Sequence, residues 1–526
     1  MPTPIDVLIV GAGPTGLMLG CELALRKVPF RIIDKTPERA GTSRALAVQA
    51  RTLEVLARHG LAEQMLANGR TSLAARAFVG RKQVTSVKLS DIGVEDTAYP
   101  VVLIASQVVT ERALEGRLRA LGHEVERPVE LTRLEVNGKA RCVLQTPRGE
   151  EVVTPRFVVG CDGAHSAVRK QGGFSFEGDA YENGFILGDV KVDGDLPPGE
   201  ILFFIAKDGP LVALPLVGES RYRIISVRAM AENEGPPQLE ELQRRIDERS
   251  PIPVKLSDAA WLTHFRLHHR IADRFRRGPL FLCGDAAHIH SPAGGQGMNT
   301  GIQDAFNLGW KLALACRGIG GETLLESYAE ERRPVGLQLL NTTDRIFSGA
   351  TTPGLMGVLR TRLVPKLAPW VLASKSRRAL LFRFISELRI SYRDSSIVST
   401  GTSFGLQGGD RVPDGPLTLP DGTPSTLHVQ LQGPAPKLLV WSDAPPPGLA
   451  AAAGAIRDAL GGELGVIEFS NAPRAGACVP SAVLQSRLGV RGLRMDLVRP
   501  DGHLSARTDS LDPTPLLLHL RRILRS

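Results

Sequence analysis

The first apolar run of the chain ends in a dense group of glycines, and this feature constrains the fold more than any other. Residues 5–10 are apolar except for Asp6 and lead into Gly11-Ala12-Gly13-Pro14-Thr15-Gly16, and a second apolar run ends in Asp34. Glycines at these positions permit a tight turn, close approach of a pyrophosphate and close packing of helix on strand. The pattern therefore predicts a strand–helix–strand unit that binds a dinucleotide, with the phosphates at the helix N-terminus and Asp34 at the adenosine ribose.

Two more apolar runs end in an aspartate beside a glycine. Residues 157–160 are followed by Cys161-Asp162-Gly163, and residues 280–283 are followed by Gly284-Asp285. A carboxylate at the end of a strand can accept hydrogen bonds from the sugar-alcohol chain of a flavin; alternatively, each aspartate caps a helix. The occurrence of both in this order, downstream of the glycine motif, favours FAD over NAD as the bound dinucleotide.

A second glycine-rich stretch precedes a predicted helix over 299–317. It reads Pro292-Ala293-Gly294-Gly295-Gln296-Gly297-Met298-Asn299. The N–H groups and the positive dipole end of this helix could face the N1/C2 region of a flavin, where negative charge develops on reduction. Glycines would let the backbone lie against the flavin ring. The alternative, an ordinary glycine-rich helix cap, leaves Pro292 and the dense glycine spacing unexplained.

Together these stretches resemble those of the single-component (group A) FAD-dependent aromatic hydroxylases. The likeness covers essentially the whole chain, includes Asp304-Ala305-Phe306-Asn307-Leu308, and is closest to the branch that hydroxylates phenols and polyketides. One position departs from the pattern, since His165 stands where many relatives have an arginine. The resemblance implies an α/β fold: a Rossmann-like FAD-binding domain of the glutathione-reductase type, an inserted antiparallel-sheet substrate domain and a C-terminal thioredoxin-like domain.

The resemblance also implies roles for individual residues. Arg44 would contact the FAD pyrophosphate, Gln107 would hold the ribityl chain, and Asp285 would bind the ribityl hydroxyls. Asp162 would serve the motif that the family shares between FAD and the nicotinamide cofactor, and Pro292 would lie beside the reactive edge of the isoalloxazine. The candidate catalytic residues are Pro292, Gly295 and Gly297. The candidate cofactor-binding residues are Gly11, Gly13, Pro14, Thr15, Gly16, Asp34, Lys35, Arg44, Gln107, Asp162, Gly163, Gly284, Asp285, Pro292, Gly294, Gly295, Gln296, Gly297, Met298 and Asn299.

The implied reaction is a monooxygenation that uses NAD(P)H and O2. FAD reduced by NADPH or NADH would react with oxygen to a C4a-hydroperoxide, which hydroxylates a phenolic or aromatic polyketide substrate. The chain has one glycine fingerprint, so the nicotinamide is expected to bind only transiently. A Baeyer–Villiger or epoxidising monooxygenase and a non-oxygenating FAD-dependent reductase remain alternatives. The candidates for a base that activates the substrate are Tyr222, Arg223, His264 and His290, among which the sequence does not distinguish.

Changes in the pattern along the chain predict its organisation. Alternating runs separated by Gly/Pro turns between 178 and 267 predict an antiparallel sheet. Residues 42–67 are predicted as a helix with an internal stop at Gly60, and the turn-rich stretch 401–421 is interpreted as a linker. The expected divisions are an FAD-binding domain over 1–177 and 271–395, the second part with a helical connector, a substrate-binding sheet over 178–270 and a thioredoxin-like unit over 396–526.

Charge limits the partners of the protein. The net charge of +9 comes from basic residues spread along the chain without interleaved aromatics, which argues against nucleic-acid binding. The one local excess of charge runs from Arg360 to Arg393, where Glu387 is the only acid. This segment is interpreted as a solvated helical connector; the alternative is a basic amphipathic helix that lies on a membrane surface.

Other features concern compartment and assembly. The sequence shows no signal peptide and no uncharged apolar stretch of about 18 residues, so we expect a cytoplasmic protein without an integral membrane segment. The six scattered cysteines predict buried thiols. The C-terminal unit holds only Cys478, so we expect it to serve packing or a homodimer contact rather than disulfide exchange. No carboxylate stands at ligand spacing from the clustered histidines, so no metal site is expected.

Overall fold

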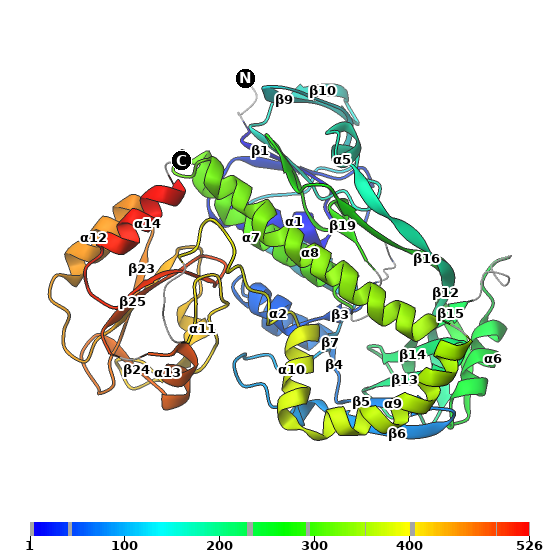
Figure 1. Ribbon diagram of the computed structural model, residues 1–526. Coiled ribbons are helices and arrows are strands. Elements are labelled where there is room, and N and C mark those ends of the chain that lie inside the picture. Colours follow the sequence, from blue (N-terminus) through cyan, green and yellow to red (C-terminus); the bar gives the residue numbers. More distant parts are fainter. Residues whose placement is uncertain are drawn as a thin grey trace.

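A computed structural model of the chain has a parallel sheet near the N-terminus, a long antiparallel sheet and a separate C-terminal sheet (Figure 1). None of the helices described is long and apolar enough to cross a membrane. All six cysteines are free thiols, and five of them are buried, as predicted. The structure describes residues 5–39, 41, 45–228, 235–290, 295–352, 354–399, 405–490 and 492–524.

Short parallel strands form the first sheet, in the order β18-β11-β1-β2, with β17 antiparallel at the edge beyond β18. Every residue of β1, β11 and β18 is buried, as expected for strands covered on both faces. The register places Val10 opposite Gly160 and Gly160 opposite Leu282, so three strands end side by side. The strands are β1 (Val7–Val10), β2 (Phe30–Ile33), β11 (Phe157–Gly160), β17 (Arg276–Arg277) and β18 (Leu280–Leu282).

Helix α1 (Pro14–Leu25) packs on this sheet and is itself in contact with two further helices. These helices are α4 (Gln107–Ala120) and α7 (Gly297–Cys316). The 30-residue helix α8 (Glu322–Thr351) lies along α7 and continues toward the antiparallel sheet (Figure 1). Almost all of α7 is buried because it is enclosed by neighbours, and it begins two residues before the predicted start at 299.

The prediction of one helix over 42–67 is wrong in its first part. Residues 42–44 lie outside the described residues, and 47–48 form strand β3 (Ala47–Val48), which pairs with β7 (Leu103–Ile104). Pairing with a distant strand therefore replaces the local helical preference. The helical part is α2 (Ala50–Ala57) and α3 (Ala62–Asn68), separated at Gly60, whose φ of 74° ends the helix as predicted.

Smaller elements border the parallel sheet. A three-stranded antiparallel sheet in the order β10-β9-β8 packs against the short helix α5, and β4 pairs with β7. These elements are β4 (Arg70–Thr71), β8 (Glu130–Asn137), β9 (Lys139–Thr146), β10 (Gly149–Val153) and α5 (Ala167–Gln171).

The predicted antiparallel sheet is present and is larger than expected. It has eight strands in the order β19-β16-β12-β15-β14-β13-β5-β6, and β5 and β6 come from a segment well before residue 178. Its two longest strands, β12 and β16, have 19 residues each and pair along most of their length. The strands are β5 (Ala74–Val79), β6 (Lys82–Lys88), β12 (Phe176–Gly194), β13 (Glu200–Ala206), β14 (Gly209–Pro215), β15 (Arg221–Arg228), β16 (Val254–Ala272) and β19 (His288–Ile289).

The two faces of this sheet have different neighbours. Helix α6 (Leu239–Arg249), which the sequence did not predict, covers one face and buries Leu242 and Ile246 against Ile186 and Ile224. The opposite face carries two apolar groups, one around Phe185, Phe265 and Val227, and one in which Ile201 packs with Leu46 and Ile104 of the β3–β7 region. This second face therefore looks toward the parallel sheet and its loops.

After α8 the chain continues into helices α9 (Leu355–Ala373) and α10 (Lys375–Ile385), which form the predicted helical connector (Figure 1). The C-terminal sheet follows, in the order β21-β20-β24-β23-β22-β25-β26. Its elements are β20 (Pro416–Thr418), β21 (Pro424–Thr426), α11 (Leu427–Gln430), β22 (Lys437–Trp441), α12 (Leu449–Ala459), β23 (Gly465–Phe469), β24 (Ala477–Pro480), α13 (Ala482–Leu488), β25 (Arg494–Val498), β26 (Leu504–Thr508) and α14 (Thr514–Leu524).

The interpretation of 401–421 as a linker is wrong for its described second half. Residues 401–404 lie outside the described residues, but Asp410, Arg411 and Val412 are buried. Arg411 pairs with Glu54 of α2 at 2.7 Å and with Asp96 at 3.2 Å. Ion pairs to a distant helix therefore hold this segment against the N-terminal half of the chain.

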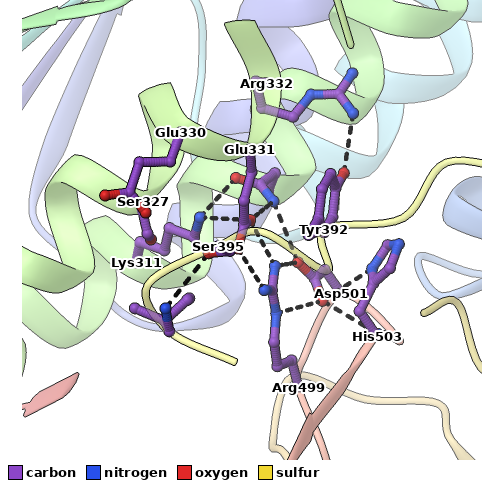
Figure 2. A network of polar contacts seen from close by, with 12 residues as sticks. Lys311, Ser327, Glu330, Glu331, Arg332, Tyr392, Ser395, Arg499, Asp501 and His503 are labelled. Atoms are coloured by element: carbon purple, nitrogen blue, oxygen red, sulfur yellow. Dashed lines mark hydrogen bonds and ion pairs between the residues drawn. The ribbon is translucent and has the colours of Figure 1, made fainter. Parts of the chain in front are cut away.

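The C-terminal sheet shares a core with α7 and α8. Trp310 and Leu324 of these helices belong to the same buried apolar cluster as Leu438, Leu497 and Leu520. Beside this cluster, Glu331 of α8 accepts hydrogen bonds from Lys311 of α7 and from Arg499, which follows β25 (Figure 2). Arg499 also pairs with Asp501. The C-terminal unit is thus joined to the helix that starts at the glycine-rich loop by both apolar and ionic contacts.

Candidate cofactor-binding and active site

The glycine turn after β1 has the geometry that a dinucleotide requires. Gly11 has a φ of 102°, and a Cβ there would lie 2.4 Å from the backbone oxygen of Cys161. A Cβ on Gly16 would lie 1.9 Å from the backbone oxygen of Gly11. A Cβ on Gly13 would meet no atom within 4 Å, so the turn is tightly packed on one side and open on the other. Pro14 and Thr15 begin α1, whose N-terminus has no side-chain cap, leaving its first N–H groups for an anion.

Asp34 lies at the end of β2 beside this turn. Its carboxylate accepts hydrogen bonds from the N–H of Ala12 (2.8 Å) and of Thr36 (2.9 Å), and Arg127 lies 3.3 Å away. Burial alone would raise the pKa of Asp34, but hydrogen bonds from Thr36 and Ala12 lower it below its usual value. The residue is therefore a carboxylate held against the glycine turn, while the neighbouring Lys35 is exposed.

Gln107 begins α4 and lies near the same region. Its N–H donates to the backbone oxygen of Ala45, and its side-chain amide donates to Glu111 at 2.8 Å. Burial raises the pKa of Glu111, although the hydrogen bond from Gln107 opposes this. Arg44, which the sequence assigned to the pyrophosphate, lies outside the described residues.

The first turns of α1 and α7 meet at the end of β18. A Cβ on Gly284 would lie 2.6 Å from the Thr15 hydroxyl oxygen, and a Cβ on Gly301 would lie 2.5 Å from the same atom. The two helices can approach because neither glycine carries a side chain. Asp285 follows Gly284 and is exposed at the carboxyl edge of the parallel sheet. The N-termini of α1 and α7 and the exposed Asp285 therefore lie at the same carboxyl edge of the parallel sheet.

Asp162 at the end of the neighbouring strand β11 behaves in part as a helix cap. One carboxylate oxygen accepts hydrogen bonds from the N–H groups of Ala167 (2.6 Å) and Val168 (3.3 Å) in α5. Its other oxygen is buried and has no hydrogen-bond partner among the described residues. Burial raises the pKa of Asp162. Gly163 follows with a φ of 75° and turns the chain toward α5.

The second glycine-rich loop is fastened to the protein by side chains. The Asn299 amide nitrogen donates to the backbone oxygens of Ala47 (2.9 Å) and Gly295 (2.8 Å), and its oxygen accepts the N–H of Gln49 (2.9 Å). Gln296 is buried and donates to the backbone oxygens of Phe384 and Ile385. Both side chains therefore fix the described part of the loop by bonding backbone groups of the protein.

The glycines of this loop have specific surroundings. Gly295 has a φ of 63°, and a Cβ there would lie 2.9 Å from the Cβ of Ala47. A Cβ on Gly297 would lie 3.4 Å from a ring nitrogen of His290, which places that histidine beside the start of α7. Met298 is half-buried in the first turn. Pro292 and Gly294 lie outside the described residues.

A buried polar cluster beneath the loop was not found from the sequence. Asp304 accepts hydrogen bonds from the N–H of Gly284 (3.1 Å) and from Arg332 (2.6 Å), and it bonds His288 at 2.8 Å. One turn earlier on α7, Thr300 donates to the buried carboxyl of Glu387 at 2.6 Å. The motif that contains Asp304 was the only sequence signal for this cluster. The contacts of Asp304 join the end of β18 to helices α7 and α8.

The four candidate bases lie on different sides of the antiparallel sheet. Leu187, Ile225 and Val212 are cross-strand partners on the face toward the parallel sheet, and Arg223 shares that face. Tyr222 and His264 alternate to the opposite face, where α6 lies. His290 is the one beside the glycine-rich loop.

The local contacts of these candidates also differ. Arg223 pairs with Asp189 at 2.7 Å and lies 5.2 Å from the ring of Trp261. Tyr222 donates its hydroxyl to the backbone oxygen of Pro197. His264 bonds Arg228 at 2.8 Å, and burial together with Arg228 lowers the pKa of His264. Among the described residues, no group of three or more His, Cys, Asp and Glu side chains is arranged to hold a metal ion.

Comparison with known proteins identifies relatives over most of the chain. Residues 4–343 match the model of the family described as FAD binding domain. A 6-methylpretetramide 4-monooxygenase of Streptomyces rimosus is 34% identical over 547 residues, which cover 99% of this chain and 95% of the relative. A pentachlorophenol 4-monooxygenase of Sphingobium chlorophenolicum is 34% identical over 78% of this chain and 76% of its own. The solved structure of the anhydrotetracycline hydroxylase OxyS from Streptomyces rimosus matches 100% of both chains with a TM-score of 0.79 and 30% identity.

Proposed function

The chain belongs to the family of FAD-dependent aromatic hydroxylases, and we propose that its substrate is a phenol or an aromatic polyketide. It is a monooxygenase that uses FAD and a nicotinamide reductant. The relatives named for 6-methylpretetramide and pentachlorophenol support the substrate class. Bound FAD would take two electrons from NAD(P)H and use O2 to insert one oxygen atom into the substrate.

One observation carries the assignment of the FAD site. The first turns of α1 and α7 meet through Thr15, Gly284 and Gly301, so that two uncapped helix N-termini serve one edge of the sheet. Helix α1 would bind the pyrophosphate of FAD, with Asp34 at the adenosine ribose. Helix α7 would present its N–H groups to the flavin, where they stabilise the negative charge of the reduced ring.

The remaining site residues would act between these two ends. Arg44 would contact the pyrophosphate, and Gln107 and Asp285 would hold the ribityl chain. Asp162 would serve the motif that is shared between FAD and the nicotinamide cofactor. Pro292, Gly295 and Gly297 would border the reactive edge of the flavin.

The same proposal covers the finer architecture. The parallel sheet with its helices would be a Rossmann-like FAD-binding domain over 1–177 and 271–395, with residues 74–88 lending two strands to the substrate sheet over 178–270. Residues 396–526 would form a thioredoxin-like domain, supported by the central β23-β22-β25 order and the flanking helices α12 and α14. A cytoplasmic location and a homodimer belong to this proposal.

The face of the antiparallel sheet that looks toward the parallel sheet is the proposed substrate surface. It offers the apolar side chains of Phe185, Leu187 and Phe265 beside the Arg223–Asp189 ion pair and Trp261. Flat apolar groups suit a polycyclic aromatic ring system, and a guanidinium can favour the anionic form of a phenol. Tyr222 and His264 lie on the other face, so Arg223 and His290 are the better candidates for contact with the substrate.

The test is a stimulation screen with the purified FAD-loaded protein. NADPH or NADH oxidation and oxygen uptake are measured with a panel of phenols and aromatic polyketides, and the products are examined by mass spectrometry. We expect stimulated oxidation, matched oxygen uptake and a product that gains one oxygen atom on an aromatic ring. A lactone or epoxide product would assign the Baeyer–Villiger or epoxidising alternative. Reductant oxidation with a hydrogenated product and no oxygen uptake would overturn the proposal.

A further inference from the structure

Helix α9 carries an apolar stripe that faces solvent. The stripe consists of Met356, Leu359, Leu363, Leu367 and Trp370, which recur at the three- and four-residue spacing of one helix face. Each is at least 41% exposed, and Trp370 is 61% exposed. Single exposed apolar residues are ordinary on protein surfaces, but a row of them along four turns of one helix requires an explanation.

The opposite face of α9 is fastened to the antiparallel sheet. A Cβ on Gly357 would lie 2.4 Å from the backbone oxygen of Lys207, so the helix is in close contact with the β13–β14 turn. Arg360 donates to the backbone oxygens of Ala206 (2.8 Å) and Gly349 (2.8 Å), and Thr361 and Pro365 line a cavity shared with this turn. The apolar stripe is therefore turned away from the protein, and α9 lies along the outer rim of the molecule (Figure 1).

The surroundings of the stripe are basic. The sequence has no Asp or Glu from Arg345 to Ser386. Arg362 and Lys366 are exposed on α9 beside the stripe, and the guanidinium of Arg377 lies 3.7 Å from the ring centroid of Trp370. The α9 surface is thus apolar along its centre and cationic at its border. It complements a partner whose outer layer is anionic and whose interior is apolar.

We propose that this α9 stripe docks on an anionic lipid bilayer. Leucines and a tryptophan would enter the boundary between headgroups and acyl chains, while Arg362, Lys366 and Arg377 would contact the acidic headgroups. A second copy of the same surface fits less well, because a symmetric contact would set the basic border of one copy against that of the other. The proposal concerns association of the protein with a membrane surface and does not depend on the substrate proposed above.

Vesicle sedimentation with the full FAD-loaded chain tests the proposal. One set of vesicles contains phosphatidylcholine alone, and the other contains equal parts of phosphatidylcholine and phosphatidylglycerol. We expect binding to the anionic vesicles at low salt, weaker binding at high salt because exposed charges are screened, and little binding to phosphatidylcholine. No binding to the anionic vesicles at low salt would overturn the proposal.

Substitutions on exposed positions locate the contact. The double variant Arg362→Glu/Lys366→Glu should lower the partition coefficient at least about 25-fold, because each basic residue near an anionic surface contributes about fivefold. Trp370→Ser should lower it about tenfold through lost apolar burial. The matched control is Leu518→Ser/Arg521→Glu/Arg522→Glu on α14, which removes one exposed leucine and reverses the charge of two exposed arginines elsewhere. It should bind as the wild type does.

Two further results would count against docking on lipid. Equal loss of binding in the control and in the α9 variants would mean that net charge, not this surface, drives adsorption. A dimer in light scattering that the Trp370→Ser variant converts to a monomer would assign the stripe to a second copy of the chain. NADPH oxidation without vesicles is measured for every variant, since its loss would report on the catalytic proposal instead.

Discussion

Replacing Glu331 by glutamine tests how the C-terminal sheet is held to α7 and α8, the helices that follow the second glycine-rich loop. The Glu331 carboxylate accepts hydrogen bonds from Lys311 (2.8 Å) and from both terminal nitrogens of Arg499 (2.6 and 2.8 Å), and all three side chains are buried (Figure 2). Glutamine preserves the shape of the side chain but leaves two cations facing a neutral amide. Asn307 and Ser395 also donate to this carboxylate, at 2.6 and 2.7 Å. The variant therefore removes the compensating charge and replaces one acceptor oxygen by an amide nitrogen that faces donors.

The pKa of Glu331 indicates how much folding stability the Glu331→Gln variant should lose. Burial alone would raise this pKa, but Arg499 and Lys311 lower it from 4.5 to about 2. That lowering corresponds to about 3 kcal/mol of folding stability. Loss of one partner from a buried ion pair destabilises proteins by a similar ~3–5 kcal/mol. Because the lowered pKa belongs to the folded state, the contribution is complete above pH 4.5 and is lost as the pH falls toward 2.

Guanidinium unfolding at neutral pH, followed by tryptophan fluorescence, measures the change. Trp310 lies in this interface, 5.2 Å from the guanidinium of Arg499, and reports on its opening. The control is Glu330→Gln on the same helix, where the carboxylate is exposed and accepts the N–H of Ser396. We expect less than about 1 kcal/mol of destabilisation for the control. Equal unfolding midpoints for the two variants would show that the charge of Glu331 does not stabilise the interface.

Three further predictions concern the site itself. The Gly13→Val variant should fold but purify without flavin. The valine side chain would meet open space in the protein and would fill the proposed phosphate position. Normal flavin absorbance of the purified variant would contradict this. Burial raises the pKa of Glu387 to about 7 despite hydrogen bonds from Thr300 and Gln303. The free energy of unfolding of the wild type should therefore fall by about 3 kcal/mol between pH 4.5 and 7. That of Glu387→Gln should not fall in this way, and denaturant midpoints measured at the two pH values would show the difference. Arg223→Met should lower substrate-stimulated NADPH oxidation at least about tenfold, and His264→Ala should lower it less than about twofold. The reason is that, of these two residues, Arg223 lies on the proposed substrate face. If steady-state rates show the reverse order, the substrate surface lies on the α6 side of the sheet.

Local sequence patterns predicted the parts of the fold that depend on neighbours in the chain. The glycine turn, the strands that end near Asp34, Asp162 and Asp285, and the helix from the second glycine-rich loop are all present. Helix α6 was missed because only Leu239, Leu242 and Ile246 mark its buried face among charged residues. Strand β3 was taken for helix because its partner, β7, lies more than fifty residues away in the sequence.

The side-chain partners at the site were less predictable than its elements. Asn299 and Gln296 were expected at the cofactor, yet their side chains bond backbone groups around Ala47 and Phe384. No pattern signalled that Glu387 would lie under the first turn of α7, because its partners Thr300 and Gln303 belong to another segment. Such contacts arise only when segments far apart in the sequence pack together.

The cofactor was predicted from local motifs in the sequence, and the reaction class from the family that these motifs resemble. A glycine turn, two strand-end aspartates and a glycine-rich helix start are local devices, since backbone conformation and helix dipoles act within a few residues. Three features depend on tertiary packing. They are the face of the antiparallel sheet that packs against the β3–β7 region, the burial of Arg411 and Arg499 beside distant carboxylates, and the outward direction of the leucines of α9. The physical reason is that burial and charge pairing depend on what lies opposite a side chain, and that is set by the packing of whole elements.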